Sequence, residues 1–375
     1  MKNRLKNSCI IVMMVCSLIF ISCQSTTTTN MDTQNMSMAT EMQATPLEGS
    51  FVEADKYGNM MTSLTADDLT TAGFTLGDII TVTVNGNNYD CPIVTTYSDV
   101  NVGEYLFRVK DNATYFSINY GNCQKKTGAE AAMPLSLTMK EKGGYLVEYQ
   151  IRHLEKSELR SDYASDVIFA NFRDVETKNI KPHTLYRSCN PALGDARAPY
   201  ADTLAMEAGV KTIINLADSK ESLEKTIDPT SWYNGMYQAG RVILLDLDVD
   251  YSGADFGKSL AQGFKFMAAG EAPVLIHCNE GKDRAGFTSV ILEALMGAPL
   301  SEITDDYMMS YVNYYDVTKG TAQYTSIAKT PYTMLMTIAQ GMDVTDENLS
   351  TIAYNYMIRN GVSDSEIAAI KAKLQ

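Results

Sequence analysis

Residues 272–288 read APVLIHCNEGKDRAGFT, and three consecutive patterns in this stretch decide the fold around it. Residues 272–277 are a short apolar run with β-branched side chains, which predicts a buried strand. A polar loop with Gly281 follows, and a helical pattern begins at Arg284. Because the first N–H groups of a helix lack partners and its dipole is positive there, we expect the loop to bind a phosphate.

The spacing of Cys278 and Arg284 allows the loop between them to wrap one oxyanion. The Cys278 thiol would lie beneath the anion, and the Arg284 guanidinium would close the rim. A thiol at a helix N-terminus beside Arg and Lys is expected to be a thiolate at neutral pH. A guanidinium can bind two phosphate oxygens with its planar fork. The two residues are therefore candidates for a nucleophile and an anion-binding group.

The loop HCNEGKDRAG, residues 277–286, resembles the phosphate-binding loop of cysteine-dependent tyrosine and dual-specificity phosphatases. Its GKDR portion resembles the atypical bacterial branch, whose members act on phosphotyrosine and often on phosphoinositides. NFRD at 171–174, LYRS at 185–188 and GVKTIINL at 209–216 also resemble this branch, so the resemblance covers about residues 165–375. A buried structural cysteine in a tight turn is the alternative, and the surrounding strand and helix favour the phosphatase loop.

The resemblance implies an α/β phosphatase domain at residues 157–375, with a parallel-type sheet flanked by helices and a helical C-terminal part. It also implies catalytic roles for Cys278, Arg284 and a general acid, for which Asp283 is favoured. The other candidates for the acid are Asp218, Asp246, Asp248, Asp250 and Asp255. The remaining loop residues are expected to bind substrate: Asn279, Glu280, Gly281, Lys282, Ala285 and Gly286.

The implied mechanism has two steps. The Cys278 thiolate attacks phosphorus, and water then hydrolyses the cysteinyl-phosphate. No metal or other cofactor is required, and His153, His183 and His277 lack the spacing of metal ligands. A lysine at the position of Lys282 accompanies highly phosphorylated substrates in the family, although simple solvation of the loop would also explain it.

Two residues depart from the family pattern. Ala285 stands where Ser or Thr commonly follows the arginine, so breakdown of the phosphoenzyme is expected to be slow or differently assisted. Glu280 places a negative charge in an anion-binding loop. These departures leave open a non-catalytic phosphate-binding surface lipoprotein with a degenerate loop as the alternative function. Sulfur or arsenate chemistry is a third interpretation, which Lys282 and Arg284 disfavour because they suit a phosphate dianion.

The composition indicates a two-domain globular protein. The chain has 375 residues, of which 45% are hydrophobic and 20% charged. Its formal net charge of −14 argues against nucleic acid as a partner, although an acidic body does not exclude a locally positive pocket. The expected partner is a substrate: a phosphorylated protein, a phosphoinositide or an inositol phosphate.

The N-terminal segment is predicted to be a targeting signal. Residues 1–22 combine a basic start with an apolar stretch too short to span a bilayer. Ile21-Ser22-Cys23 resembles a bacterial lipoprotein cleavage box, which implies a lipid on Cys23 and an exported protein anchored to the bacterial cell membrane. An ordinary signal peptide or an uncleaved anchor is the alternative. Residues 23–47 are polar without periodicity and are predicted to be a flexible tether.

Residues 48–156 are predicted to form a small all-β barrel or sandwich. Turn signals separate its expected strands, which are residues 49–54, 79–84, 89–95, 104–110, 115–120 and 144–151. Three phrases resemble the C-terminal β-domain of the S-adenosylmethionine hydroxide adenosyltransferases: VEADKYGNMMTSL (52–64), TYSDVNVGE (96–104) and SINYGNCQKKTGA (117–129). The resemblance implies the fold and not the activity, because residues 1–47 contain no counterpart of that family's catalytic domain.

The cysteines leave two pairings open. Cys91 and Cys123 could form a disulfide or remain buried thiols. Cys189 ends the LYRS strand, and a protective disulfide with Cys278 is conceivable, although disulfide geometry is demanding.

Residues 157–375 alternate between strand and helix patterns, which is typical of a parallel sheet covered by helices. Strands are expected at 184–188, 210–218, 241–250 and 272–277. Helices are expected at 198–209, 253–269, 284–297, 300–315, 325–341, 346–359 and 363–374.

Overall fold

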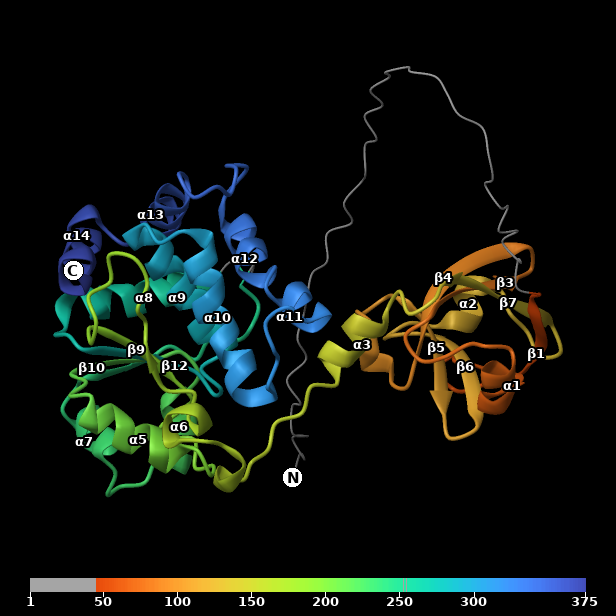
Figure 1. Ribbon diagram of the computed structural model, residues 1–375, viewed down its shortest axis with the longest axis horizontal. Coiled ribbons are helices and arrows are strands. Elements are labelled where there is room, and N and C mark those ends of the chain that lie inside the picture. Colours follow the sequence, from red (N-terminus) through yellow and green to blue (C-terminus); the bar gives the residue numbers. More distant parts are fainter. Residues whose placement is uncertain (1–44, 252, 254) are drawn as a thin grey trace, which may run out of the picture. The chain divides into compact units, whose positions relative to one another are not determined.

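The computed structural model describes residues 45–251, 253 and 255–375, which form two compact units that divide between His153 and Leu154 (Figure 1). The predicted signal segment, the predicted lipidation site Cys23 and nearly all of the predicted tether lie outside the described residues. Within the described residues, no helix has the length and apolar character needed to cross a membrane.

The first unit is a closed barrel with the strand order β1-β2-β6-β5-β4-β3-β7, which confirms the predicted β-domain. All paired strands are antiparallel except β4 and β5. The strands are β1 (Leu47–Ala54), β2 (Met60–Thr65), β3 (Ile79–Val84), β4 (Asn87–Val94), β5 (Tyr105–Lys110), β6 (Ala113–Ile118) and β7 (Pro134–Glu141). Three helices accompany them: α1 (Ala66–Thr71), α2 (Cys123–Thr127) and α3 (Leu146–Arg152).

Side-chain alternation forms the barrel core. In β3, every second residue is buried, and the Asn85-Gly86 turn that joins it to β4 has positive φ at both positions, 49° and 73°. This is the backbone that a tight two-residue hairpin requires. The predicted strand and turn are therefore confirmed at this hairpin.

The prediction of a strand at residues 144–151 was wrong. This segment contains helix α3, because Tyr145 and Tyr149 lie one helical turn apart and pack on the same small apolar cluster of the barrel wall. The barrel is closed instead by β7, which was not predicted and which pairs with both β1 and β3. Leu135 and Leu137 of β7 are buried in the core.

The second unit is built on a five-stranded sheet with the order β11-β10-β12-β9-β8. Four of these strands are parallel, as predicted, but the edge strand β8 is antiparallel to β9, so the sheet is mixed. The strands are β8 (Arg173–Asp174), β9 (Leu185–Ser188), β10 (Thr212–Asn215), β11 (Val242–Leu244) and β12 (Val274–His277).

Helices cover both faces of this sheet. In Figure 1, α5, α6 and α7 lie on one face, and α8 and α9 lie on the other with α13 and α14 beside them. The helices are α4 (Asp166–Phe169), α5 (Ala198–Glu207), α6 (Lys220–Thr226), α7 (Trp232–Gln238), α8 (Phe256–Ala269), α9 (Asp283–Met296), α10 (Leu300–Tyr315), α11 (Ala322–Ile327), α12 (Thr330–Ile338), α13 (Leu349–Arg359) and α14 (Asp364–Leu374).

Helix α9 is the central helix of this unit, since every residue from Ala285 to Met296 is buried. It follows β12 after a short loop, and both elements were predicted from the sequence. The single helix expected at 325–341 is divided into α11 and α12. Pro331 stands in the first turn of α12, where its missing N–H costs no hydrogen bond.

Candidate active site

The loop between β12 and α9 lies at the carboxyl end of the parallel strands, where ligands of open α/β sheets usually bind. Cys278 directly follows β12, and its side chain is buried, with 3% exposed. Helix α9 begins at Asp283, so the N–H groups of its first turn have no partner within the helix. The strand and the buried helix fix both ends of the loop.

Four successive backbone carbonyls of this loop, at residues 279–282, accept hydrogen bonds from the surrounding protein. When carbonyls point outward, the N–H groups between them face the opposite side and form a concave anion-binding nest. The Asn190 N–H donates to the Asn279 oxygen at 3.1 Å. Asn171 Nδ2 and Tyr314 Oη donate to the Glu280 oxygen at 3.0 and 2.8 Å. Arg187 Nη2 donates to the Gly281 and Lys282 oxygens at 2.8 and 3.2 Å.

Two glycines allow this close packing. Gly281 has a φ of +68°, and a Cβ atom there would lie 2.2 Å from the backbone oxygen of Ser188 at the end of β9. A Cβ atom on Gly286 would lie 2.8 Å from the Tyr307 ring. A side chain at either position would therefore push the loop away from the residues that orient it.

Arg187, which orients the loop, belongs to a buried ionic network. Its Nη1 pairs with Asp306 Oδ2 at 2.6 Å, and Arg173 Nε pairs with Asp306 Oδ1 at 2.8 Å. Burial opposes the charged form of Asp306, but the two guanidinium groups lower its pKa to about 2. Burial and the neighbouring Asp306 carboxylate raise the pKa of Glu293 well above its usual value. Asp306 thus carries the charge of this carboxyl pair.

Arg284 lies at the start of α9, and its Nη1 donates to the Leu247 carbonyl at 2.7 Å. Its Nε is buried and has no hydrogen-bond partner among the described residues. A buried guanidinium donor without an acceptor is costly unless a ligand satisfies it. Arg284 therefore retains a donor that could bind one oxygen of a phosphate.

Lys282 and Asp283 form a close ion pair. Lys282 Nζ lies 2.9 Å from Asp283 Oδ1 and 3.0 Å from Oδ2, and 5.1 Å from the centre of the Tyr311 ring. Burial opposes the charged ammonium, but Asp283, Tyr311, Tyr315 and Glu280 raise the pKa of Lys282 well above its usual value. Lys282 is therefore a buried permanent cation beside the loop and not a solvated surface residue.

Of the other candidates for the general acid, Asp218 has a structural role. Its carboxylate accepts hydrogen bonds from Asn190 Nδ2 (2.7 Å), Asn215 Nδ2 (2.9 Å) and Ser222 Oγ (3.1 Å). The side chain is 6% exposed. These contacts join the end of β10 to the loop after β9 and the start of α6, so Asp218 is engaged in holding the site together.

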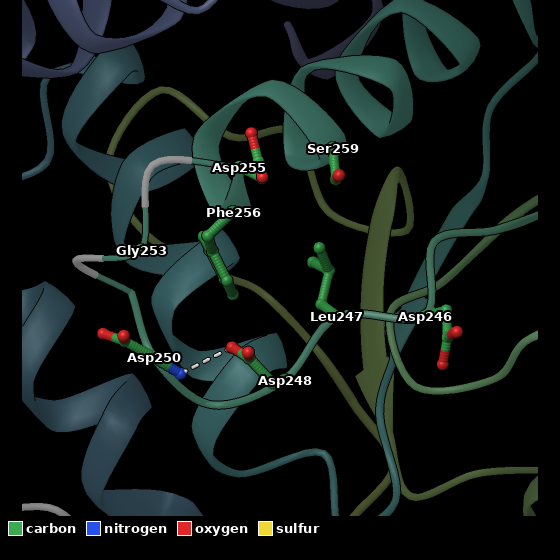
Figure 2. A pocket seen from close by; sticks show the side chains of 8 residues that line it. All are labelled: Asp246, Leu247, Asp248, Asp250, Gly253, Asp255, Phe256 and Ser259. Carbon is green, nitrogen blue, oxygen red and sulfur yellow. Dashed lines mark hydrogen bonds between the residues drawn. The ribbon is translucent and has the colours of Figure 1, made fainter.

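The remaining acidic candidates gather on one loop. Asp246, Asp248, Asp250 and Asp255 belong to the lining of a hollow of about 260 Å³, and Figure 2 shows their side chains. The Asp248 carboxylate accepts a hydrogen bond from the Asp250 N–H at 2.8 Å. Since Leu247 of this loop contacts Arg284, the hollow adjoins the phosphate loop. No cluster of His, Cys, Asp and Glu suited to a metal ion occurs in the part of the chain that the structure describes.

Tyrosines surround the loop on the other sides. Tyr251 stacks on Phe287, with ring centres 4.6 Å apart and planes at 4°. Tyr307, Tyr311 and Tyr314 of α10 are buried. The Tyr314 hydroxyl also orients the Glu280 carbonyl.

Sequence reasoning missed the residues that orient the loop. Asn171 and Arg187 lie in the NFRD and LYRS segments that carried the resemblance, yet no role was assigned to them. An arginine inside a short apolar strand was a usable signal, because a fully buried guanidinium must be paired. Nothing in the sequence distinguished Tyr251 or Lys156, which also lie beside the loop.

The described cysteines are all free and buried: Cys91, Cys123, Cys189 and Cys278. Neither of the two disulfides considered from the sequence is formed. Burial is the main cause that raises the pKa of Cys189. Cys189 is accordingly a neutral thiol packed beneath the loop.

His277 is held as a neutral imidazole. Its Nε2 lies 2.9 Å from the Tyr233 hydroxyl, and burial lowers its pKa from 6.5 to about 4. The unfolded chain therefore binds a proton between these pH values that the folded chain does not bind. The contribution of His277 to stability is present above pH 6.5 and is lost as the pH falls toward 4.

We expect His277→Gln to flatten the pH dependence of the free energy of unfolding between pH 4 and 6.5, a change of about 3 kcal/mol across this range. Denaturant unfolding at a series of pH values measures the slope. His183→Asn is the matched control, because its side chain is 76% exposed and asparagine tolerates the positive φ of 65° there. An unchanged slope in His277→Gln would show that another group titrates.

Comparisons with known proteins match both units. The model described as tyrosine phosphatase family matches residues 168–375. The model of the SAM hydroxide adenosyltransferase C-terminal domain matches residues 49–136. These matches confirm the resemblance to tyrosine phosphatases and the resemblance to the SAM hydroxide adenosyltransferase C-terminal domain. A comparison with curated proteins found no match.

Solved structures match at low similarity. An uncharacterized conserved protein from Thermotoga maritima is 17% identical, covers 25% of this chain and 36% of its own, and has a TM-score of 0.24. A conserved hypothetical protein from Thermus thermophilus is 24% identical, with coverages of 24% and 34% and a TM-score of 0.20. The core catalytic domain of PP-IP phosphatase SIW14 from S. cerevisiae, in complex with citrate, is 20% identical, with coverages of 42% and 83% and a TM-score of 0.27. The chain spans about a third of the length of the first two.

Proposed function

Because the chain belongs to the tyrosine phosphatase family through residues 168–375, we propose that it hydrolyses phosphate monoesters through a covalent intermediate on Cys278. The observation that carries the proposal is the orientation of the carbonyl groups at 279–282, all of which are bonded away from the loop interior. A phosphate in the resulting nest would lie between the Cys278 thiol and the first turn of α9.

In the proposed reaction, the Cys278 thiolate attacks phosphorus. The S–P bond forms as the bond to the leaving oxygen breaks, and that oxygen takes a proton from a general acid. Water then attacks the cysteinyl-phosphate, which releases inorganic phosphate and restores the thiolate. Arg284 would stabilise the equatorial oxygens with its free Nε, while loop N–H groups bind the others.

We assign the general acid to Asp283. In the ligand-free protein its carboxylate is paired with Lys282 at 2.9 Å. A bound phosphate dianion attracts the Lys282 ammonium more strongly than a single carboxylate does, so binding would draw Lys282 from Asp283. Asp283 could then hold the proton that the leaving group needs. Substrate binding and activation of the acid are coupled in this proposal through one lysine.

Asp283→Asn is expected to lower kcat/KM, which reports the first step, about 100-fold on a phosphotyrosine peptide, whose phenolate leaves with difficulty without a proton. On 2,4-dinitrophenyl phosphate, which releases a stabilised anion, the loss should be less than about 5-fold. Steady-state kinetics on both substrates measures the contrast. Asp248→Asn is the matched control on the acidic loop. If Asp248→Asn shows the contrast and Asp283→Asn does not, the acid lies on the acidic loop.

Two expectations extend the proposal. Ala285 is fully buried and offers no hydroxyl to assist departure of the thiolate, so we expect breakdown of the phosphoenzyme to limit turnover. The substrate is proposed to be a phosphotyrosine protein, a phosphoinositide or an inositol phosphate. The lipid proposed at Cys23 would hold the enzyme at the outer face of the cell membrane, where the substrate would have to be available.

The experiment that tests the function is phosphate release by protein that begins at Gln24, with its thiols reduced. The substrates are a phosphotyrosine peptide, a phosphoserine peptide, phosphoinositides and inositol phosphates. Release that disappears in Cys278→Ser supports the enzyme. If folded, reduced protein releases phosphate from no substrate, the enzymatic function is overturned and a phosphate-binding module is favoured. The negative charge of Glu280 and the absence of a hydroxyl at Ala285 would then be features of a loop that binds phosphate without catalysis.

A further inference from the structure

Residues 156–163, here called the linker strap, precede the family match and pack against the phosphatase unit. Arg197 fastens the strap, since its Nη2 donates to the Ser157 carbonyl and lies 3.2 Å from the Tyr163 hydroxyl. The Arg197 side chain is 2% exposed and lies against the ring of Phe169, 4.3 Å from its centre. The strap is therefore held by a buried arginine and not by surface contacts alone.

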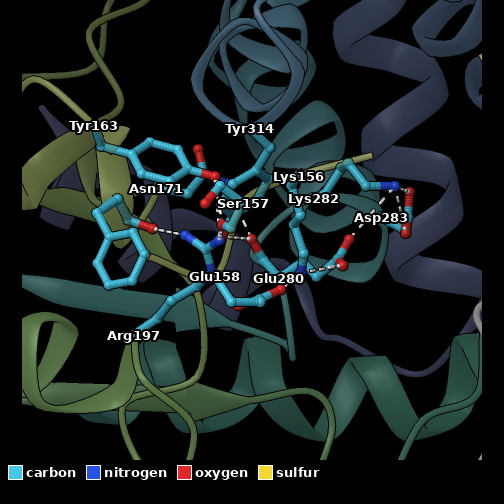
Figure 3. A network of polar contacts seen from close by, with 11 residues as sticks. Lys156, Ser157, Glu158, Tyr163, Asn171, Arg197, Glu280, Lys282, Asp283 and Tyr314 are labelled. Atoms are coloured by element: carbon cyan, nitrogen blue, oxygen red, sulfur yellow. Dashed lines mark hydrogen bonds and ion pairs between the residues drawn. The ribbon is translucent and has the colours of Figure 1, made fainter. Parts of the chain in front are cut away.

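The strap places Lys156 beside the phosphate loop. Figure 3 shows Lys156 and Lys282 reaching the same carboxylate, that of Glu280. Lys156 Nζ lies 2.8 Å from Glu280 Oε1, and Lys282 Nζ lies 3.8 Å from Glu280 Oε2. Burial opposes the charged form of Glu280, but Lys282 and Lys156 hold its pKa below the usual range. One carboxylate thus bridges two ammonium groups.

Each of the two lysines also has a second carboxylate nearby: Glu158 Oε1 lies 3.4 Å from Lys156 Nζ, and Asp283 Oδ1 lies 2.9 Å from Lys282 Nζ. Lys156 and Lys282 are 20% and 2% exposed, so each needs a nearby anion in place of water. Glu280 is the carboxylate that both ammonium groups share, and it is 24% exposed, which leaves its side chain room to turn toward solvent. A phosphate dianion carries more charge and more acceptor oxygens than a carboxylate.

We propose that Lys156 and Lys282 form a second anion subsite beside the phosphate loop, which the Glu280 carboxylate occupies in the free protein and a second phosphate of the substrate occupies in the complex. Lys156 is then a specificity-determining residue that the chain supplies from outside its phosphatase family segment. The substrate class is a phosphate ester with a second phosphate close to the scissile one. This inference rests on the proposed function and narrows its substrates.

Binding by the Cys278→Ser variant tests the subsite without turnover. The probes are inorganic phosphate, which fills the loop alone, and inositol hexakisphosphate, which has neighbouring phosphates. Calorimetry should show that adding Lys156→Met weakens the binding of inositol hexakisphosphate about 10-fold and the binding of inorganic phosphate less than about 2-fold. Adding Glu280→Gln should strengthen the binding of inositol hexakisphosphate, because a competing anion is removed. Lys225→Met is the control, since Lys225 forms an exposed ion pair with Glu221 on α6.

The sign of the Glu280→Gln effect separates the subsite from a structural ion pair. If the pair only holds the strap in place, Glu280→Gln and Lys156→Met weaken both probes equally, which would overturn the proposal. If the binding of inositol hexakisphosphate depends on Lys156 but the wild-type protein releases no phosphate, the subsite would be retained and the proposed enzymatic function overturned. If the wild-type protein releases phosphate from monophosphates, but Lys156→Met leaves the binding of inositol hexakisphosphate unchanged, the enzymatic function would be retained and the subsite overturned.

Discussion

Replacing Cys278 with serine is expected to lower phosphate release from every substrate by a factor on the order of 10⁴ or more. A serine hydroxyl is not ionised at neutral pH, and the Nε2 atom of the neighbouring His277 ring is engaged with the Tyr233 hydroxyl. The substitution changes one buried atom and leaves the carbonyl contacts of the loop in place. Initial rates of phosphate release at matched protein concentration measure the loss.

Binding separates loss of the nucleophile from loss of the fold. The Cys278→Ser variant should bind inorganic phosphate and unfold thermally at the temperature of the wild-type protein. In the wild-type protein, acid quenching during turnover should trap phosphate on Cys278, since Ala285 leaves breakdown of the intermediate unassisted. Activity that survives in Cys278→Ser would show that another group carries the reaction.

Asp306→Asn is expected to lower the free energy of unfolding of the phosphatase unit by about 3–5 kcal/mol. The substitution removes the carboxylate that pairs with Arg173 and Arg187, whose side chains are 11% and 0% exposed, and leaves Glu293 as the remaining carboxyl of the network. Because Arg187 also holds the Gly281 and Lys282 carbonyls, catalysis should fall together with stability. Denaturant unfolding followed by tryptophan fluorescence reports on this unit, which contains Trp232, the one tryptophan of the chain.

The adjacent residue is a matched control. Asp305 lies on the same helix and pairs with Lys319, but the two side chains are 58% and 71% exposed. Exposed pairs contribute little, so Asp305→Asn should leave the free energy of unfolding unchanged. The Asp306 contribution should also be lost as the pH falls from 3.8 toward 2, because its folded-state pKa lies below the unfolded value. Equal effects at 305 and 306 would show that the buried network does not stabilise the unit.

The sequence was most informative where one local pattern had one solution. The alternation in β3 and the Asn85-Gly86 turn predicted their hairpin, since the turn residues and the strand period agree. The segment at 144–151 offered no such agreement. It contains a helix, in which Tyr145 and Tyr149 pack on the same apolar cluster of the barrel wall. Strand β7 was missed because its pairing partners, β1 and β3, are distant in the sequence.

The same distinction between local patterns and distant contacts applies to the phosphate loop. Strand, loop and helix at 272–297 were readable because each depends on neighbours a few residues away. The structural role of Asp218 depended in part on a contact that sequence distance hides, since Asn190, which donates to its carboxylate, lies 28 residues away in the chain.

By itself, the sequence determined that the chain has a β-domain followed by an α/β unit, and that Cys278 and Arg284 enclose a loop between a strand and a helix. Only the tertiary structure decided which way the loop faces. Its carbonyls are oriented by Asn171, Arg187 and Tyr314, which are far from it in the chain. Periodicity and capping are local properties of a chain. Hydrogen bonds across buried surfaces depend on folding to bring distant donors to one place.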